Sequence, residues 1–314
     1  MTISVALLWD VGAMLGEGPV WLPGEAALRF VDIKGGALHR FHPASGEGRS
    51  VAVGGQPSFI LPHHDGGFLI GSGHGVHRWA DDGADGTDGA DGADAAGRPL
   101  TPPVATINQP AGNRTNDATV DAHGRLWLGT MDDGETAQTG ALWCADAAGL
   151  HPMGGDAIVT NGPAITADGR WLYHVDSAAR RIIRYAMGDG PDGGGRGAAP
   201  RVDDARLFVQ FSPDDGYPDG VVLDGEDCLW VAMWDGWAVR RYAPDGRLMA
   251  HIPMPCARVT KIAFGGAGMT TAFVTTARIG IHPADRARQP HAGGLFAFDA
   301  GVAGRAVPPA RWPV

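Results

Sequence analysis

Four short segments of the chain carry an oxygen-bearing side chain at the same place, just before a small or acidic residue and a short apolar run. They read Glu17-Gly-Pro-Val, Asn116-Asp-Ala-Thr, Asn161-Gly-Pro-Ala and Asp219-Gly-Val-Val. Carboxylate and amide oxygens, without histidine or cysteine, are the ligands that hard divalent cations prefer. If the four segments converge in space, the sequence predicts a metal site.

Each segment taken alone has a simpler explanation, because Asn, Asp and Gly are common in the turns that precede strands. Glutamate is not a typical turn residue, yet Glu17 occupies the equivalent position in the first segment. Four such residues in register favour ligation over turn formation. The donor set alone admits calcium, magnesium, manganese, iron(II) and zinc.

The elements that must position these side chains belong to an internal repeat. Short apolar runs are separated by glycine and proline, of which the chain has 49 and 23, and this pattern indicates strands and turns. One unit recurs along the chain: an apolar pair, then a polar turn, then a strand rich in Trp, Leu and Val. Its copies begin at the equivalent positions Glu17, Pro57, Asn116, Asn161, Asp219 and Lys261. The spacings are typical of four-stranded propeller blades.

The repeat predicts an all-β fold, a six-bladed β-propeller with four-stranded blades, in one domain over residues 1–314. A pair of β-sandwiches would not explain so long a repeat in constant register. The segment ISVALLWDV is expected to pair with the last blade near GGLFAFDAG and to close the ring. Two low-complexity tracts, near 81–98 and 188–200, lengthen two of the spacings and are predicted to be loop insertions.

The composition limits the partners. A formal net charge of −10 disfavours nucleic acid and anionic membranes. No stretch approaches the roughly 20 apolar residues of a membrane helix, and the N-terminus lacks a signal-peptide pattern, so we expect a cytoplasmic protein. The sequence leaves the oligomeric state open and is compatible with a monomer. Three isolated cysteines, Cys144, Cys228 and Cys256, predict buried thiols and no disulfide framework.

The same segments resemble the SMP-30/gluconolactonase/regucalcin-like family, whose members are six-bladed propellers. The resemblance covers nearly the whole chain and rests on LGEGPVW at 15–21, NRTNDATVDAHGRLWLGTMDD at 113–133, TNGPAITADGRWLYHVDS at 160–177 and PDGVVLDGEDCLWVA at 218–232. It implies a sugar lactonase with one divalent metal ion, Fe2+, Zn2+, Ca2+ or Mn2+, and a small-molecule sugar lactone as substrate. TNGPA and VDSAARRI look most like bacterial aldonolactonases, which implies a pentonolactone such as xylonolactone or L-arabinonolactone, or gluconolactone.

The resemblance also implies roles for individual residues. The metal ligands would be Glu17, Asn161 and Asp219, and the substrate-binding residues would be Arg114 and Asn116. The ion would polarise the lactone carbonyl, and Asp219 is the expected general base for the attacking water. Some family members place a substrate-contacting glutamate where this chain has Gly134, and the sequence does not decide whether Glu135 replaces it.

Two other functions stay open at this stage. A propeller phosphotriesterase or aryl-esterase would use a similar oxygen-ligated metal in a more apolar pocket, which Arg114 disfavours. A non-catalytic propeller would bind the metal, or a partner, as a rigid platform. Trp234 and Trp237 follow the strand of the fifth unit, and the sequence does not decide whether they border the pocket.

Overall fold

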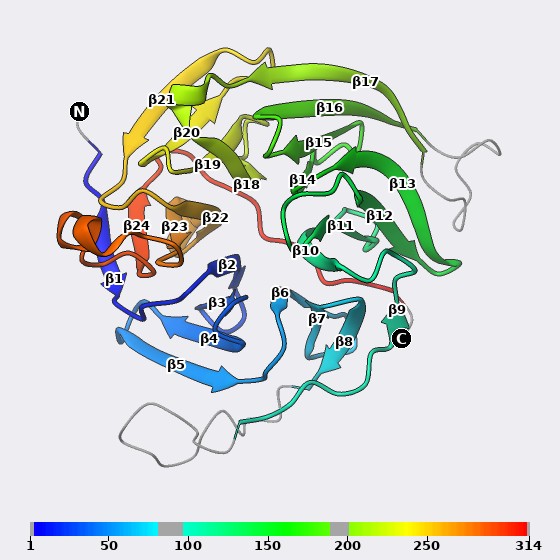
Figure 1. Ribbon diagram of the computed structural model, residues 1–314, viewed down its shortest axis with the longest axis horizontal. Helices are drawn as coiled ribbons and strands as arrows, with labels where there is room; N and C mark the ends of the chain where they lie inside the picture. Colours follow the sequence, from blue (N-terminus) through cyan, green and yellow to red (C-terminus); the bar gives the residue numbers. More distant parts are fainter. Residues whose placement is uncertain (1–2, 81–96, 189–200, 313–314) are drawn as a thin grey trace.

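A computed structural model describes residues 3–80, 97–188 and 201–312, and it shows six antiparallel four-stranded sheets around a central axis (Figure 1). The first two blades consist of β2 (Gly16–Leu22), β3 (Ala27–Asp32), β4 (Ala37–His42) and β5 (Glu47–Ala52), and of β6 (Pro57–Pro62), β7 (Phe68–Ser72), β8 (Gly75–Trp79) and β9 (Ala105–Thr106). The third and fourth consist of β10 (Asn113–Val120), β11 (Leu126–Asp132), β12 (Gly140–Asp146) and β13 (Gly149–Ala157), and of β14 (Thr160–Ile165), β15 (Trp171–Asp176), β16 (Arg181–Gly188) and β17 (Arg201–Gln210).

The last two blades complete the ring. They consist of β18 (Tyr217–Leu223), β19 (Leu229–Trp234), β20 (Ala238–Tyr242) and β21 (Leu248–Pro253), and of β22 (Val259–Gly265), β23 (Thr271–Thr276), β24 (Leu295–Asp299) and β1 (Ala6–Trp9). Short 3-10 helices lie at Pro213–Asp215, Ala267–Met269 and Pro283–Arg288. The predicted six-bladed propeller is confirmed.

The N-terminal strand closes the ring as predicted. β1 pairs antiparallel with β24, with Ala6 opposite Ala297, so one blade contains both early and late parts of the chain. The segment after β24 adds further connections: Gly304 donates to the Met269 carbonyl, and Ala310 donates to the Pro62 carbonyl. These hydrogen bonds tie the C-terminal segment to the sixth and second blades.

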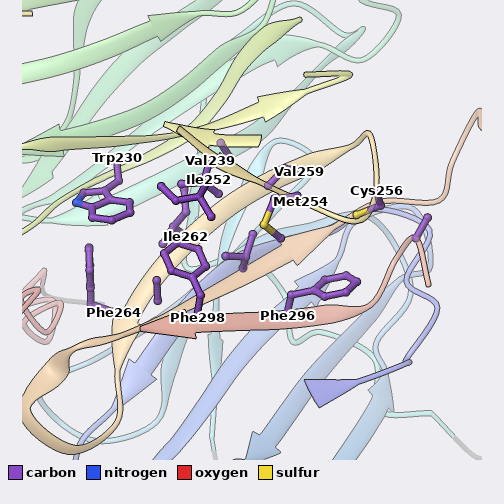
Figure 2. Close-up of a cluster of buried hydrophobic side chains, with 14 of the residues drawn as sticks. Trp230, Val239, Ile252, Met254, Cys256, Val259, Ile262, Phe264, Phe296 and Phe298 are labelled. Atoms are coloured by element: carbon purple, nitrogen blue, oxygen red, sulfur yellow. The ribbon is translucent and has the colours of Figure 1, made fainter. Parts of the chain in front are cut away.

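Burial falls from the axis outward. All seven residues of β2 are buried, whereas most residues of the outermost strand β17 are exposed. The inner strands are buried because they pack between neighbouring blades, yet β10 (NRTNDATV) is mostly polar, since these strands also carry the cavity residues. Figure 2 shows one interface between blades, where Trp230 of the fifth blade packs with Phe264 and Phe298 of the sixth. Full burial of each such side chain contributes about 1.5–3 kcal/mol.

The low-complexity tracts predicted near 81–98 and 188–200 lie almost entirely outside the described residues. All three cysteines are described, and they are buried and free, as predicted. Among the described residues, no helix has the length and apolar character needed to span a bilayer.

Candidate active site

The innermost strands bring the predicted site residues to one cavity. This cavity has a volume of about 480 Å³ and lies at the starts of β2, β10, β14 and β18. Its lining includes all five predicted residues, Glu17, Arg114, Asn116, Asn161 and Asp219. Glu17 and Asp219, which are 202 positions apart in the chain, thus face one space, as the repeat predicts for equivalent positions.

A local irregularity in each inner strand directs these side chains. The pairing with the next strand shifts between Glu17 and Val20, between Thr115 and Ala118, between Asn161 and Ala164 and between Pro218 and Val221. Bulges of this kind turn a side chain away from the regular alternation of a strand. Gly162 has a φ of 74°, a conformation that favours glycine. Gly18 (φ 53°) and Gly162, which follow Glu17 and Asn161, therefore permit the backbone conformation of the bulge.

Close packing explains a second glycine. A Cβ atom added at Gly220 would lie 2.5 Å from Cγ of Lys261 and 2.8 Å from the carbonyl oxygen of Thr260. The innermost strands of the fifth and sixth blades approach each other at this point. The glycine after Asp219 therefore permits the contact between blades that brings Lys261 to the axis.

A chain of hydrogen bonds orients the polar groups of the cavity. Nη1 of Arg114 donates to Oδ1 of Asn116 at 2.6 Å, and Nδ2 of Asn116 donates to Oδ1 of Asn161 at 3.0 Å. Nδ2 of Asn161 donates to Oγ of Ser177 at 3.0 Å. Because both amide nitrogens are engaged as donors, the amide oxygen of Asn161 is the atom available to a cation.

Arg114 is held in turn by Asp133. Nε of Arg114 lies 2.7 Å from Oδ1 of Asp133, which also accepts from Nζ of Lys34 at 2.7 Å. Partial burial opposes ionisation of Asp133, but hydrogen bonds from Lys34, Arg114 and Gln56 outweigh it and lower the pKa to about 2. Asp133 is therefore ionised at neutral pH, and it fixes the arginine at the cavity wall.

The two carboxylates of the cavity lie in an environment that penalises their charge. Burial, and then repulsion by Asp117, raise the pKa of Glu17 to about 8. Burial, and then repulsion by Glu17, raise the pKa of Asp219 well above its usual value. Glu17 is only 6% exposed and Asp219 only 8%. A bound cation would remove this penalty.

Sequence reasoning missed the ion pair between Lys261 and Asp117. Nζ of Lys261 contacts Oδ1 of Asp117, and both residues are buried. Oδ2 of Asp117 accepts the backbone N–H of Gly162 at 3.0 Å, next to the predicted ligand Asn161. The repeat identifies Lys261 as the equivalent position in the sixth unit, but it does not indicate Asp117 as the partner of Lys261.

The donor set fits a divalent cation. Oε2 of Glu17 accepts the N–H of Gly18 at 2.7 Å, which leaves Oε1 for a ligand. Within the described part of the chain, the Asp219 carboxylate has no hydrogen bond or ion pair, although the residue is buried. Two buried carboxylates and one oriented amide oxygen would offer a divalent cation a hard, all-oxygen donor set.

Other residues complete the cavity. Glu135 lines it with a φ of 55°, whereas Gly134 is not among the lining residues. This left-handed turn brings Glu135 to the cavity, although it is one position out of register. Trp234 also lines the cavity, and Trp237 does not; instead, its ring lies 5.9 Å from Cζ of Arg288.

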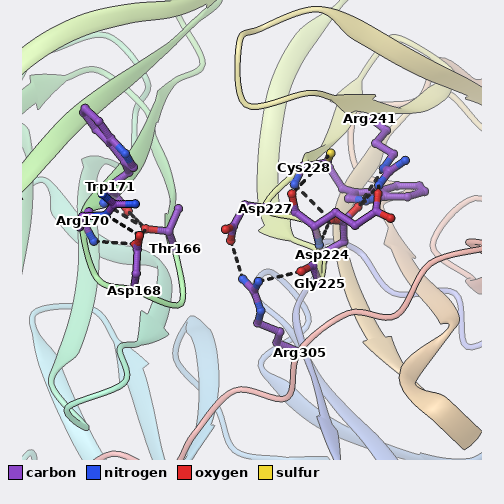
Figure 3. A network of polar contacts seen from close by, with 12 residues as sticks. Thr166, Asp168, Arg170, Trp171, Asp224, Gly225, Asp227, Cys228, Arg241 and Arg305 are labelled. Atoms are coloured by element: carbon purple, nitrogen blue, oxygen red, sulfur yellow. Dashed lines mark hydrogen bonds and ion pairs between the residues drawn. The ribbon is translucent and has the colours of Figure 1, made fainter.

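Acidic clusters elsewhere have structural partners. Asp224, Glu226 and Cys228 lie close enough together to hold an ion. However, Oδ2 of Asp224 accepts Nε1 of Trp230 and Nε of Arg241, both at 2.8 Å, and Oδ1 accepts two backbone N–H groups (Figure 3). The Asp224 carboxylate is thus saturated by donors of its own blade, and this cluster stabilises the blade rather than a metal.

Comparison with known proteins relates this geometry to a family. A family model described as "SMP-30/Gluconolactonase/LRE-like region" matches residues 15–278. A 6-deoxy-6-sulfogluconolactonase of Pseudomonas putida is 30% identical over 298 residues, which cover 94% of each chain. Pentonolactonase XacC of Haloferax volcanii is 30% identical over 308 residues, which cover 96% of this chain and 97% of the relative.

A solved structure shows the same fold. The crystal structure of a calcium-binding protein, regucalcin, from Agrobacterium tumefaciens superposes with a TM-score of 0.82 and 26% identity. The match covers 99% of this chain and 98% of the other. The likeness therefore extends over the whole propeller.

Proposed function

We propose that this chain, which belongs to the SMP-30/gluconolactonase/LRE-like family and is a sugar lactonase, hydrolyses an aldonolactone with the help of a divalent metal ion. Pentonolactones, such as xylonolactone and L-arabinonolactone, and gluconolactone are the proposed substrates. The observation that carries the proposal is the presence, in one cavity, of two buried carboxylates and of Arg114, which Asp133 and Asn116 orient.

Glu17, Asn161 and Asp219 would hold the ion. When bound, a divalent ion supplies a Lewis acid that polarises a carbonyl and lowers the pKa of a coordinated water. The candidates are Fe2+, Zn2+, Ca2+ and Mn2+, since an all-oxygen site admits each of them. The hydrogen bond from Gly18 holds the Glu17 carboxylate in one orientation.

Arg114 is suited to bind the sugar. Its Nε and Nη1 atoms are committed to Asp133, Asn116 and a backbone carbonyl. Nη2 has no hydrogen-bond partner among the described residues, so it can donate to a sugar hydroxyl or to a lactone oxygen. Since Asp133 is ionised and fixed, this donor is positioned before substrate binds.

Asp219 would act as the general base. Its carboxylate takes a proton from water while the water oxygen adds to the lactone carbonyl carbon. The bond between that carbon and the ring oxygen then breaks, and the ring oxygen takes up a proton as the new hydroxyl group. The product is the open-chain aldonic acid: the water oxygen becomes part of its carboxyl group, and one proton of the water ends on the former ring oxygen.

Initial rates of lactone hydrolysis test this proposal. Chelator-treated protein is assayed with xylono-, arabinono-, glucono- and galactonolactone before and after addition of each candidate ion. We expect one ion to restore hydrolysis above the spontaneous rate and one lactone to react fastest. Absence of hydrolysis with every ion and lactone, while the protein still binds metal, would refute the proposal, and phosphotriesters and aryl esters would then be assayed.

A further inference from the structure

A second arginine faces the cavity from the turn between β15 and β16. Arg180 lines the cavity with Ser177 and Ala178 of the same turn. Its backbone is held firmly: its N–H donates to the Ser177 carbonyl at 3.0 Å, and its own carbonyl accepts the N–H of Phe211 at 2.8 Å. A φ of 52° at this non-glycine residue shows that the turn directs the side chain at some conformational cost.

An aromatic ring fixes the guanidinium of Arg180. Its Cζ lies 3.9 Å from the centroid of the Tyr217 ring, a close cation–π contact. Tyr217 also lines the cavity. A guanidinium that stacks through its flat face can still donate hydrogen bonds, because its N–H groups point outward in the guanidinium plane.

No carboxylate neutralises Arg180 within the residues that the structure describes. Its Nε is buried without a hydrogen-bond partner, and its terminal Nη1 and Nη2 atoms, which can reach a ligand, make no hydrogen bond or ion pair with these residues. By contrast, Arg114 pairs with Asp133, and Arg258, which stacks on Trp234, pairs with Asp235. Arg180 is therefore the cavity arginine that keeps its charge and donors for a ligand.

The position of Arg180 suits the far end of a bound sugar. Tyr217 and Asp219 are two residues apart on β18, which corresponds to about 7 Å along a strand. A lactone with its carbonyl at Asp219 would therefore extend its sugar chain towards the ring of Tyr217 and the guanidinium stacked on it. Guanidinium groups bind carboxylate, phosphate and sulfonate oxygens in pairs, and neutral hydroxyls less strongly.

We infer that Arg180, held on Tyr217, is a specificity-determining residue that binds an anionic substituent at the end of the sugar lactone remote from the carbonyl. The inference rests on the proposed lactonase function and deepens it. Among sugar lactones, those with a carboxylate, a phosphate or a sulfonate at the remote end should then be preferred over the neutral lactones named above.

Selectivity between matched lactones tests the inference. Gluconolactone is compared with counterparts that carry a carboxylate, phosphate or sulfonate at the sixth carbon, and the three arms identify the anion. We expect wild-type kcat/KM to be higher for one of the anionic lactones. In Arg180→Gln, the ratio of kcat/KM for that lactone to kcat/KM for gluconolactone should fall by about tenfold or more, mainly through KM.

Three further variants separate binding from structure. Arg206→Gln removes an exposed arginine on β17 and should leave the ratio unchanged. Arg180→Lys keeps the charge without the planar fork, so it should recover only part of the ratio. Tyr217→Leu removes the stacking surface and should lower the ratio in the same direction as Arg180→Gln. A ratio that is near one in wild type, or unchanged in Arg180→Gln, would overturn the inference.

A binding measurement distinguishes this failure from failure of the lactonase proposal. Calorimetry compares gluconate with 6-phosphogluconate, 6-sulfogluconate and glucarate, which share one carboxylate and differ by the second anion. If wild type binds one of the compounds with a second anionic group more tightly than gluconate, and Arg180→Gln does not, the inference is supported even if no lactone is hydrolysed. Equal affinities in both proteins would overturn it even if lactones are hydrolysed.

Discussion

Replacement of Glu17 by glutamine should change how the stability of the metal-free protein depends on pH. The pKa of Glu17 is raised from 4.5 to about 8, first by burial and then by Asp117. Between these two values, the folded protein binds more protons than the unfolded chain does. The free energy of unfolding of the metal-free protein should therefore fall as pH rises from about 4.5 to about 8.

The magnitude follows from the two pKa values. For Glu17 alone, linkage gives a loss of about 4 kcal/mol between pH 5 and pH 9. Asp219 changes stability in the same direction, because its pKa is also raised. Glutamine has a similar shape and no titratable proton, so Glu17→Gln should remove most of the part that Glu17 contributes.

Urea unfolding of chelator-treated protein at several pH values measures this effect. Glu47→Gln, which removes an exposed carboxylate on β5, is the matched control and should keep the wild-type pH dependence. A saturating divalent ion should abolish the loss in wild type, because the cation stabilises the ionised form. The same pH dependence in wild type and Glu17→Gln would refute the electrostatic description of the site.

Three further predictions concern single contacts. Asp219→Asn should lower kcat by about 10²- to 10⁴-fold in metal-loaded protein because it removes the general base, and wild-type turnover in steady-state assays would exclude that role. Lys261→Met should lower the free energy of unfolding by about 3–5 kcal/mol because it leaves Asp117 buried without its cation, and the double variant with Asp117→Leu should recover part of this loss in urea titrations. Asp224→Ala should destabilise the fifth blade by about 2–4 kcal/mol because Trp230 Nε1 loses its acceptor, yet KM should not change; a large change in KM would show that the site depends on this cluster.

The repeat made the fold and much of the cavity predictable. Equivalent positions in a propeller occupy equivalent places on the innermost strands, so Glu17, Asn161 and Asp219 had to approach the axis once the repeat was recognised. The bulges at which the inner strands depart from regular pairing lie at the same residues, but the sequence did not predict them. The closing contact of β1 with β24 was predictable from the unpaired apolar segments at the two ends.

Contacts between blades depended on the tertiary structure. Asp117 and Lys261 are 144 residues apart, and no local pattern links them. Glu135 reaches the cavity because a left-handed turn displaces it by one position, which strand periodicity does not encode. Trp234 and Trp237 have similar sequence surroundings, yet only Trp234 lines the cavity.

The sequence by itself determined the number of blades, the direction of the predicted ligands towards the axis and the oxygen chemistry of the site, because these properties repeat with the strand and blade periods. The tertiary structure decided which charges meet there. Arg180 is oriented by Tyr217 on the next blade, and its charge is not neutralised by a carboxylate among the described residues. The balance of charge in the cavity is set by packing between blades, since electrostatic energies depend on distance and burial rather than on order along the chain.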